Sequence, residues 1–434
     1  MHITSHLDVD LVAIESDDAV TVMLELQAPA APESQASRAD HTAVVVLDRS
    51  GSMGGQRLEH AKRALLTLVS RLDDRDRFGL VVFDHESSVA VPAGRVGETG
   101  RTAIRAAIAA VTARGSTDLS SGYLRGLQEA KRVAGPTGAT IVLVSDGHAN
   151  AGIVDPDRLE AVAAKHSRDS ISTSTIGIGS GYDDRILAAL AVGGSGNHHF
   201  AMEADQAGAV LAGEIEGLLA KTVQAASLHI RPTDDVAGGK LLNDGLPVQQ
   251  VEDGVLAELG DMYAGEVRKV LLTIDVPAMA RLGLATIATL TLTYVELPSL
   301  EEHTVTLPVS VNVVPADIAE GRTAKPEVTA EKLFLETQRR KRAVEDALRR
   351  GDITSARTMT LDMSSQVFDA PPAAMTDELR AEAEWLGATE AMLDSQDAAY
   401  LTKRMAADRH RKSRGFKTRR GGEVPQVDDD TDDR

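Results

Sequence analysis

Residues 46–54 read VLDRSGSMG and place three oxygen-bearing side chains at alternate positions, Asp48, Ser50 and Ser52. This cluster ends the run HTAVVVLD (41–48), a continuous stretch of apolar residues that is typical of a strand buried on both faces. One carboxylate and two hydroxyls are ligand types that a hard divalent cation prefers. The spacing therefore indicates a metal site where a buried strand ends.

Two more oxygen groups follow predicted elements further along the chain. Asp146 comes at the end of a third apolar run, ATIVLVSDG (139–147), and Thr117 lies in the loop GSTDLSSG (115–122), which opens a helix. In an open, doubly wound sheet, ligands bind at the carboxyl ends of the strands, near the point where the strand order reverses. We therefore expect the five side chains to converge on one rim from three loops.

The five side chains form an all-oxygen set of two carboxylates and three hydroxyls. The set contains no nitrogen or sulfur ligand that would favour zinc or copper. Mg²⁺ takes few protein ligands and keeps several waters, so a short, hydroxyl-rich site favours Mg²⁺, with Mn²⁺ or Ca²⁺ as the alternatives. The expected metal ligands are Asp48, Ser50, Ser52, Thr117 and Asp146.

The segment around these residues alternates between strand and helix patterns. Apolar runs with strand character are followed by segments with helical periodicity, and a closing amphipathic helix is predicted over 205–221. This alternation predicts an α/β fold, a doubly wound, Rossmann-like domain over 41–222 with a parallel sheet. The strands are predicted at 41–48, 77–84, 139–147, 171–179 and 197–202, and further helices at 56–72, 102–111, 120–133, 157–167 and 183–191.

The flanking segments have other periods. Residues 7–14 and 19–26 alternate like a β-hairpin, and residues 223–315 alternate like an antiparallel β-sandwich, so we expect the hairpin (1–27) to pair into the sandwich. A helical module of two or three helices is predicted over 327–411. A disordered tail is predicted over 412–434.

Composition limits the classes of function. The 434 residues contain 46 lysines and arginines against 65 aspartates and glutamates, a net charge of −19, which disfavours non-specific binding to nucleic acid or anionic membrane. The absence of cysteine excludes disulfides and zinc–thiolate sites. The N-terminus has no signal-peptide pattern, and no apolar run approaches the ~20 residues that span a bilayer. We expect a cytoplasmic protein.

Enzyme motifs lack support. HExxH, GxxxxGK[ST] and GxSxG motifs in a suitable context are absent from the sequence, and Ser50 has no convincing base partner for nucleophilic chemistry. We therefore expect a protein that is not an enzyme.

The motifs together resemble a known family. DRSGS, the threonine of GSTDL and the aspartate of VSDG are similar to the DxSxS…T…D metal-ion-dependent adhesion site of the von Willebrand factor type A domain, over about residues 41–221. The resemblance implies that Ser50, Ser52 and Thr117 bind Mg²⁺ through their hydroxyls. It also implies that Asp48 and Asp146 act through bound waters, and that an acidic side chain of a partner protein completes the site.

The order of hairpin, α/β domain, sandwich and helices resembles bacterial relatives of the inter-alpha-trypsin inhibitor heavy chains. Similar proteins are often described as chloride-channel-like, a description that we do not extend to a chain without a predicted membrane span. The expected function is metal-dependent protein–protein binding. If capture of the partner favours one position of the helix at 205–221, binding could be relayed to the sandwich.

Two alternatives come from other functional classes. The metal could only staple the loops of a scaffold, with partners docking on the helices. The basic segment 402–422 could bind nucleic acid, although DDDTDD (428–433) follows closely and would compete for its charges. The sequence does not identify the partner, and it leaves the oligomeric state open.

Simpler explanations apply to single residues. Asp48 and Ser50 could cap the helix near 55, and Thr117 or Asp118 could cap the helix at 120. His198 and His199 are expected to be loop or core histidines, and Asp84, His85 and Glu86 a surface turn. His148 and Asn150 lie next to Asp146 and could contact the partner.

Overall fold

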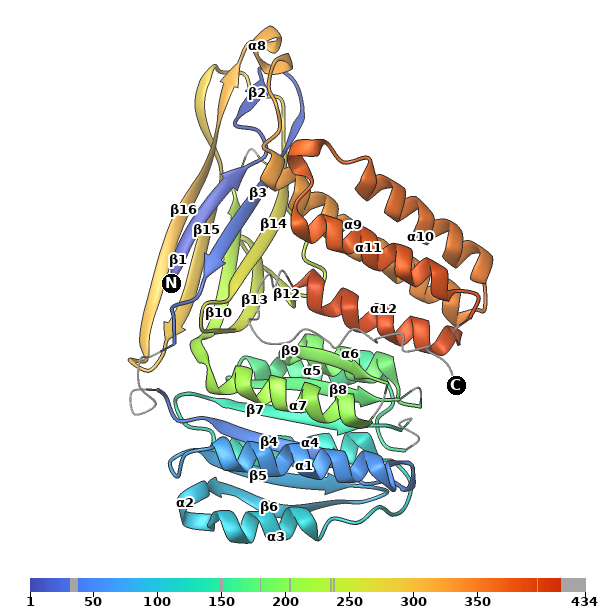
Figure 1. Ribbon diagram of the computed structural model, residues 1–434. Helices are drawn as coiled ribbons and strands as arrows, with labels where there is room; N and C mark the ends of the chain where they lie inside the picture. Colours follow the sequence, from blue (N-terminus) through green and yellow to red (C-terminus); the bar gives the residue numbers. More distant parts are fainter. Residues whose placement is uncertain are drawn as a thin grey trace.

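The computed structural model describes residues 1–31, 38–147, 151–179, 181–202, 204–234, 236, 239–395 and 397–414. Figure 1 shows three parts: an α/β domain, a domain of two antiparallel sheets, and a helical module packed beside both. Within the described residues, no helix is long and apolar enough to cross a membrane.

The α/β domain is built on a six-stranded sheet with the order β6-β5-β4-β7-β8-β9. All neighbouring strands are parallel except β6, which pairs antiparallel with β5. The predicted α/β fold is therefore confirmed, but the strand and helix pattern missed β6. The strands are β4 (Thr42–Asp48), β5 (Arg77–Phe83), β6 (Ser87–Arg95), β7 (Ala139–Ser145), β8 (Ile171–Ile178) and β9 (Ser195–Ala201).

Helices cover both faces of this sheet because its strands are apolar on both faces. Val45 and Leu47 pack in one core with α1 (Gln56–Arg71), α3 (Arg101–Ala109) and α7 (Ala204–Leu219). Val44 and Val46 pack in a second core on the opposite face. That core contains α4 (Leu119–Val133), α5 (Pro156–Ser167) and α6 (Asp184–Gly193), while the short α2 (Val96–Thr99) lies between β6 and α3.

The second domain consists of two sheets that enclose one hydrophobic core and are antiparallel apart from the β2–β16 pair. β3 pairs with β14 over ten residues, and β2 pairs in parallel with β16, so the N-terminal strands belong to this domain. The α/β domain is thus inserted between its parts. The four-stranded sheet has the order β1 (His2–Leu7), β3 (Asp18–Gln27), β14 (Val267–Val276) and β11 (Gly239–Leu241). The six-stranded sheet has the order β12 (Val248–Val251), β13 (Gly254–Tyr263), β10 (Lys221–Pro232), β15 (Gly283–Glu296), β16 (Glu301–Val314) and β2 (Leu11–Ala13).

The helical module contains four helices, where the sequence predicted two or three. The stretch predicted after the break at 369–374 is divided again at 393–397. The four are α9 (Pro326–Arg349), α10 (Ile353–Phe368), α11 (Asp377–Met392) and α12 (Ala398–Ser413); the short α8 (Ala316–Glu320) and a 3₁₀ turn (Pro372–Ala374) complete the region.

The predicted start of the disordered tail, at residue 412, is too early in the chain. α12 continues to Ser413, and the side chain of Arg414 is buried, with its guanidinium donating to the carbonyl oxygens of Ser195 and Gly196. The interdomain contact therefore orders residues 412–414, which composition alone places in the tail. The rest of the predicted tail lies outside the described residues.

A buried ionic network holds α9, α11 and α12 together. Lys341 is fully buried, and its Nζ lies 2.6 Å from carboxylate oxygens of Glu382 and of Asp408. Lys412 contacts the same two carboxylates at 2.7 and 2.9 Å. Burial alone would raise the pKa of Glu382 and Asp408, but the charges of Lys341 and Lys412 hold both pKa values below their usual range.

We predict that Lys341→Ala destabilises the helical module by about 3–5 kcal/mol, because it leaves buried carboxylates without a principal partner. The single tryptophan, Trp385, lies with its ring centroid 4.0 Å from Lys341 Nζ, so its fluorescence during urea unfolding reports on this module. Arg342→Ala is the matched control, since Arg342 is exposed, and we expect a change within about 0.5 kcal/mol. Equal stability of the two variants would contradict the prediction.

Candidate metal centre

The predicted metal ligands lie at the carboxyl edge of the parallel sheet, where the strand order reverses. From β4, the chain continues to β5 and β6 on one side and later to β7, β8 and β9 on the other. Asp48 is the last residue of β4, and Asp146 directly follows β7, which pairs with β4. Splayed loops at such a switch point leave a crevice for a ligand.

Four of the five residues form one chain of hydrogen bonds. The backbone N–H of Ser50 donates to Asp48 Oδ1 at 2.7 Å, and the hydroxyls of Ser50 and Ser52 lie 3.0 Å apart. Ser52 Oγ donates to Asp146 Oδ1 at 2.7 Å. Asp48, Ser50 and Asp146 are buried, whereas Ser52 is exposed and marks the open side of the site.

Thr117 faces the same small space from the third loop. A Cβ atom added to Gly147 would lie 3.0 Å from Thr117 Oγ1 and 3.7 Å from Asp48 Oδ2. Thr117 is itself buried. The structure thus brings all five predicted side chains together, and the glycine at 147 keeps the space between them open.

Helix capping does not account for these residues. α1 begins after Gly55, which has no side chain to cap it, and Ser50 makes no side-chain cap to the 3₁₀ turn at Gly51–Met53. α4 is capped by Asp118, whose carboxylate accepts from Ser121 N at 2.9 Å. The hydroxyls of Ser50 and Thr117 therefore serve neither helix.

The buried charges make a cation favourable here. Burial raises the pKa of Asp48 to about 6, against hydrogen bonds from Ser145 and Ser50 that lower it, and the negative charge of Asp146 raises it further. A divalent cation would favour the ionised form of Asp48. An all-oxygen donor set around a small open space fits a hard ion such as Mg²⁺. Among the described residues, no group of three or more His, Cys, Asp or Glu side chains is placed to hold a metal.

Sequence reasoning missed two supporting carboxylate contacts. Ser145 Oγ donates to Asp48 Oδ2 at 2.6 Å, and Arg57 Nη1 lies 2.6 Å from Asp146 Oδ2. Ser145 precedes the motif aspartate in VSDG, so its position could have indicated a role. Arg57 lies in α1, and only the folded chain brings it to Asp146.

The prediction of a surface turn at 84–86 is wrong for Asp84. Its side chain is fully buried and accepts from Arg49 Nε at 2.8 Å and Arg114 Nε at 2.9 Å, with His85 Nδ1 at 2.8 Å. Burial alone would raise the pKa of Asp84, but the two arginines hold it below its usual value. Asp84 comes where a predicted buried strand ends, as Asp48 does. This shared position could have indicated that the side chain of Asp84 is buried.

Backbone hydrogen bonds tie the loops of Ser50 and Thr117 to each other and to the loop after β5. Arg114 N donates to Arg49 O at 2.7 Å, Gly51 N to Gly115 O at 3.0 Å, and Asp118 N to Asp84 O at 2.7 Å. Gly115 has φ +72°, and a Cβ there would lie 2.6 Å from the ring of His85. Glycine is therefore required at this junction.

Of the two histidines after β8, His198 is a core residue, whereas His199 is partly exposed. His198 is buried, with Nδ1 2.9 Å from Thr175 Oγ1, and His199 Nε2 lies 2.7 Å from Glu214 Oε2. They lie on β9, outside the metal centre. His148 and Asn150, the predicted partner contacts, lie outside the described residues.

The basic segment 402–422 is largely engaged within the protein where the structure describes it. Lys403 donates to the carbonyl of Tyr182 at 2.6 Å, Arg409 Nε lies 2.6 Å from Glu345, and Lys412 contacts Glu382. Among the described residues, the acidic partners Glu345 and Glu382 come from the helical module. Little of this charge remains for nucleic acid before residue 415.

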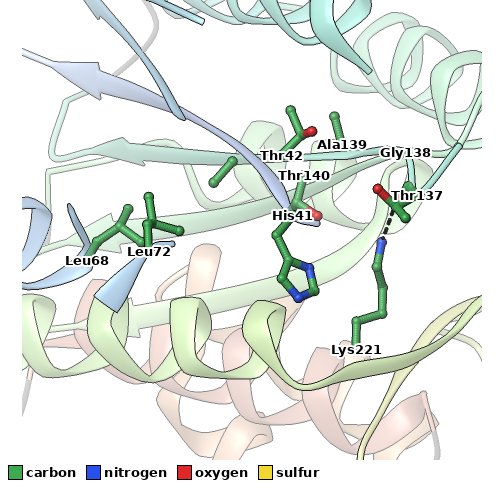
Figure 2. Close-up of a pocket in the computed structure, with 10 residues that line it drawn as sticks. His41, Thr42, Leu68, Leu72, Thr137, Gly138, Ala139, Thr140 and Lys221 are labelled. Atoms are coloured by element: carbon green, nitrogen blue, oxygen red, sulfur yellow. Dashed lines mark hydrogen bonds between the residues drawn. The ribbon is translucent and has the colours of Figure 1, made fainter. Parts of the chain in front are cut away.

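Figure 2 shows a small pocket at the opposite edge of the sheet, lined by the starts of β4 and β7. Lys221 Nζ donates to the carbonyl of Thr137 at 3.1 Å and lies 3.1 Å from Asp261 Oδ2. The volume of this pocket, about 10 Å³, is too small for any ligand larger than a water molecule.

Comparison with known proteins agrees with this geometry. Residues 43–212 match the family model of the von Willebrand factor type A domain. The uncharacterized protein sll0103 of Synechocystis is 33% identical over 153 residues, 35% of this chain and 36% of that protein. Human inter-alpha-trypsin inhibitor heavy chain H3 is 25% identical over 169 residues, 36% of this chain and 18% of its own length. The matched segment thus spans about a third or less of these relatives.

A solved structure extends the likeness to the other parts of the chain. A von Willebrand factor type A protein from Catenulispora acidiphila has a TM-score of 0.69 at 15% identity, covering 90% of this chain and 88% of that one. This likeness shows a shared fold across all three parts. Domains of the family bind a divalent metal at the motif that residues 48–52 begin, and they mediate protein–protein interactions. The chain therefore contains a von Willebrand factor type A domain, at residues 43–212.

Proposed function

We propose that this protein binds a partner protein through Mg²⁺ held at the metal centre, where the ion takes an acidic side chain of the partner, and that it is not an enzyme. The observation that carries the proposal is the convergence of five oxygen-bearing side chains from three loops. Hydrogen bonds between 2.7 and 3.0 Å join four of the residues, and Thr117 faces the same space. Family membership of residues 43–212 supports it.

Each residue has a distinct role in this proposal. The hydroxyls of Ser50, Ser52 and Thr117 would bind the ion directly, and the carboxylates of Asp48 and Asp146 would hold its waters in place. When bound, the ion supplies a strong positive charge at an open position. Because hydroxyls are neutral ligands, they leave most of that charge available to an external carboxylate.

Burial explains why such a site would select an anionic group. Asp48 and Asp146 are buried, so their charge acts mainly on the ion, while the exposed Ser52 leaves one side accessible. Ser145 and Arg57 fix the two carboxylates and limit their movement toward the ion. A partner carboxylate can then occupy the coordination position of the ion that these side chains leave open.

The scaffold alternative uses the same ion differently. If the metal only holds the loops together, it adds stability but no binding surface, and partners dock elsewhere. The two functions therefore predict the same effect of metal on stability, but only the proposed function predicts that partner binding depends on metal.

We predict that Mg²⁺ stabilises the α/β domain, because the folded site binds the ion and the unfolded chain does not. At a concentration of 100 times Kd, the gain is about 2.7 kcal/mol, or about 5 °C in the midpoint of thermal unfolding. Differential scanning calorimetry with Mg²⁺ and with EDTA measures it. Ser52→Ala should reduce the gain, whereas the exposed Ser70→Ala should keep it.

An unchanged midpoint at saturating Mg²⁺, Mn²⁺ and Ca²⁺ would contradict a metal site of any kind. Ser52 is the preferred position for this test, since its side chain is exposed and its truncation leaves the buried carboxylates in place.

We also predict that a partner protein is captured from native lysate only when the metal site is intact. The arms are wild type in Mg²⁺, wild type in EDTA, and both Ser52→Ala and Asp48→Ala in Mg²⁺, after circular dichroism shows all to be folded. Retention by the first arm alone is expected, because the ion provides the contact.

Equal retention in every arm would exclude metal-mediated capture and favour the scaffold alternative. Retention that disappears in the Asp48→Ala arm but survives EDTA would also count against the proposal, because it would show that fold, rather than metal, controls binding.

A further inference from the structure

We infer that the metal centre takes a polyacidic segment, in which one carboxylate binds the ion and a second binds an arginine beside it. This inference rests on the proposed function and adds a class of ligand to it. Three arginines lie beside the metal ligands and form what we term the arginine rim. Arg49 and Arg114 come from two of the loops that carry the ligands, and Arg57 comes from α1.

Two members of the rim are accessible to a partner. The side chains of Arg57 and Arg114 are 41% and 56% exposed, whereas Arg49 is 12% exposed. Arg114 contacts Asp84 through Nε, and no hydrogen bond from its two terminal nitrogens to a described residue is present. These nitrogens are the pair that a guanidinium offers to a carboxylate in a bidentate contact.

The rim is built in position rather than free to rotate. Asp84 is fully buried and accepts from both Arg49 and Arg114, and Arg114 N donates to Arg49 O in the backbone. Gly115 and Thr117 follow Arg114 directly, so the rim and the metal ligands share a loop. A preorganised donor loses less entropy on binding than a mobile surface arginine does.

Charge balance then indicates the ligand. Asp84 contacts both Arg49 and Arg114, so Asp84 matches only one of these two positive charges, and a divalent ion adds further positive charge nearby. A single partner carboxylate on the ion leaves the terminal nitrogens of Arg114 unused. A segment with two or more carboxylates can contact both the ion and the exposed guanidinium of Arg114.

Arg57 is expected to affect metal binding and ligand binding in opposite directions. Its Nη1 lies 2.6 Å from Asp146 Oδ2, so it reduces the negative charge available to the ion while adding positive charge for the ligand. Removing Arg57 should therefore strengthen metal binding and weaken ligand binding. A residue with a merely structural role would weaken both.

The chain itself contains a polyacidic segment, DDDTDD at 428–433. The ligand could be this segment or an acidic segment of another protein, since the chemistry is the same. To separate the two, binding is measured on the full chain and on a full-length variant with all five of these aspartates changed to asparagine. Stronger binding by the variant assigns the site to the chain's own segment, and equal binding assigns it to another protein's segment.

The probe is a fluorescent peptide with the sequence of residues 424–434, compared with the same peptide that keeps a single aspartate. Fluorescence anisotropy in Mg²⁺ measures peptide affinity, and isothermal titration with Mg²⁺ alone measures metal affinity. The variants are Arg57→Ala and Arg114→Ala, with the exposed Arg281→Ala in the two-sheet domain as the control of equal charge.

We expect the polyacidic peptide to bind at least tenfold tighter than the single-aspartate peptide, and only in Mg²⁺. Arg114→Ala should weaken peptide binding about three- to tenfold with metal affinity unchanged, and Arg57→Ala should weaken the peptide while raising metal affinity. Arg281→Ala should change neither. Equal affinity for both peptides, or wild-type peptide binding by both rim variants, would overturn the inference. Failure to bind Mg²⁺ at all would instead contradict the proposed function.

Discussion

The structure depends on holding two like charges, those of Asp48 and Asp146, inside a sheet edge that excludes most water. Uncompensated, buried carboxylates of this kind are costly, and the raised pKa of Asp48 reflects that cost. The neighbouring groups all reduce it: Ser145 and the Ser50 amide donate to Asp48, and Ser52 and Arg57 donate to Asp146. A metal ion would reduce it further, which links ion binding to the local fold.

Much of this arrangement follows from local sequence. The apolar run at 41–48 specifies a strand buried on both faces, and the alternation with helical periods specifies the doubly wound order, so the switch point and its loops could be predicted. The five ligands could be predicted because each follows a strand or opens a helix. What these residues bind stays a prediction.

The rest could not be predicted because it depends on pairing between distant segments. β6 carries a proline and a half-exposed pattern, so only its pairing with β5 identifies it as a strand. Arg57 and Asp146 are far apart in the sequence, and an arginine on an amphipathic helix has no local signature of an ion pair. The basic side chains of α12 likewise pair with Glu345 and Glu382, and the periodicity of the sequence does not indicate these ion pairs.

The described contacts also bear on how capture of a partner could reach the other domains. A shift of α7 was the route that the sequence suggested, but Glu214 on α7 is buried and held by Ser174, Asn197 and His199. Moving that helix along the sheet would unpair a buried charge, at about 3–5 kcal/mol. The loop before α6 connects the metal site to the helical module: Lys403 of α12 donates to Tyr182 O, and a Cβ on Gly181 would lie 3.0 Å from Asp146 O. The contacts therefore favour the helical module over the two-sheet domain as the first element to sense the metal site.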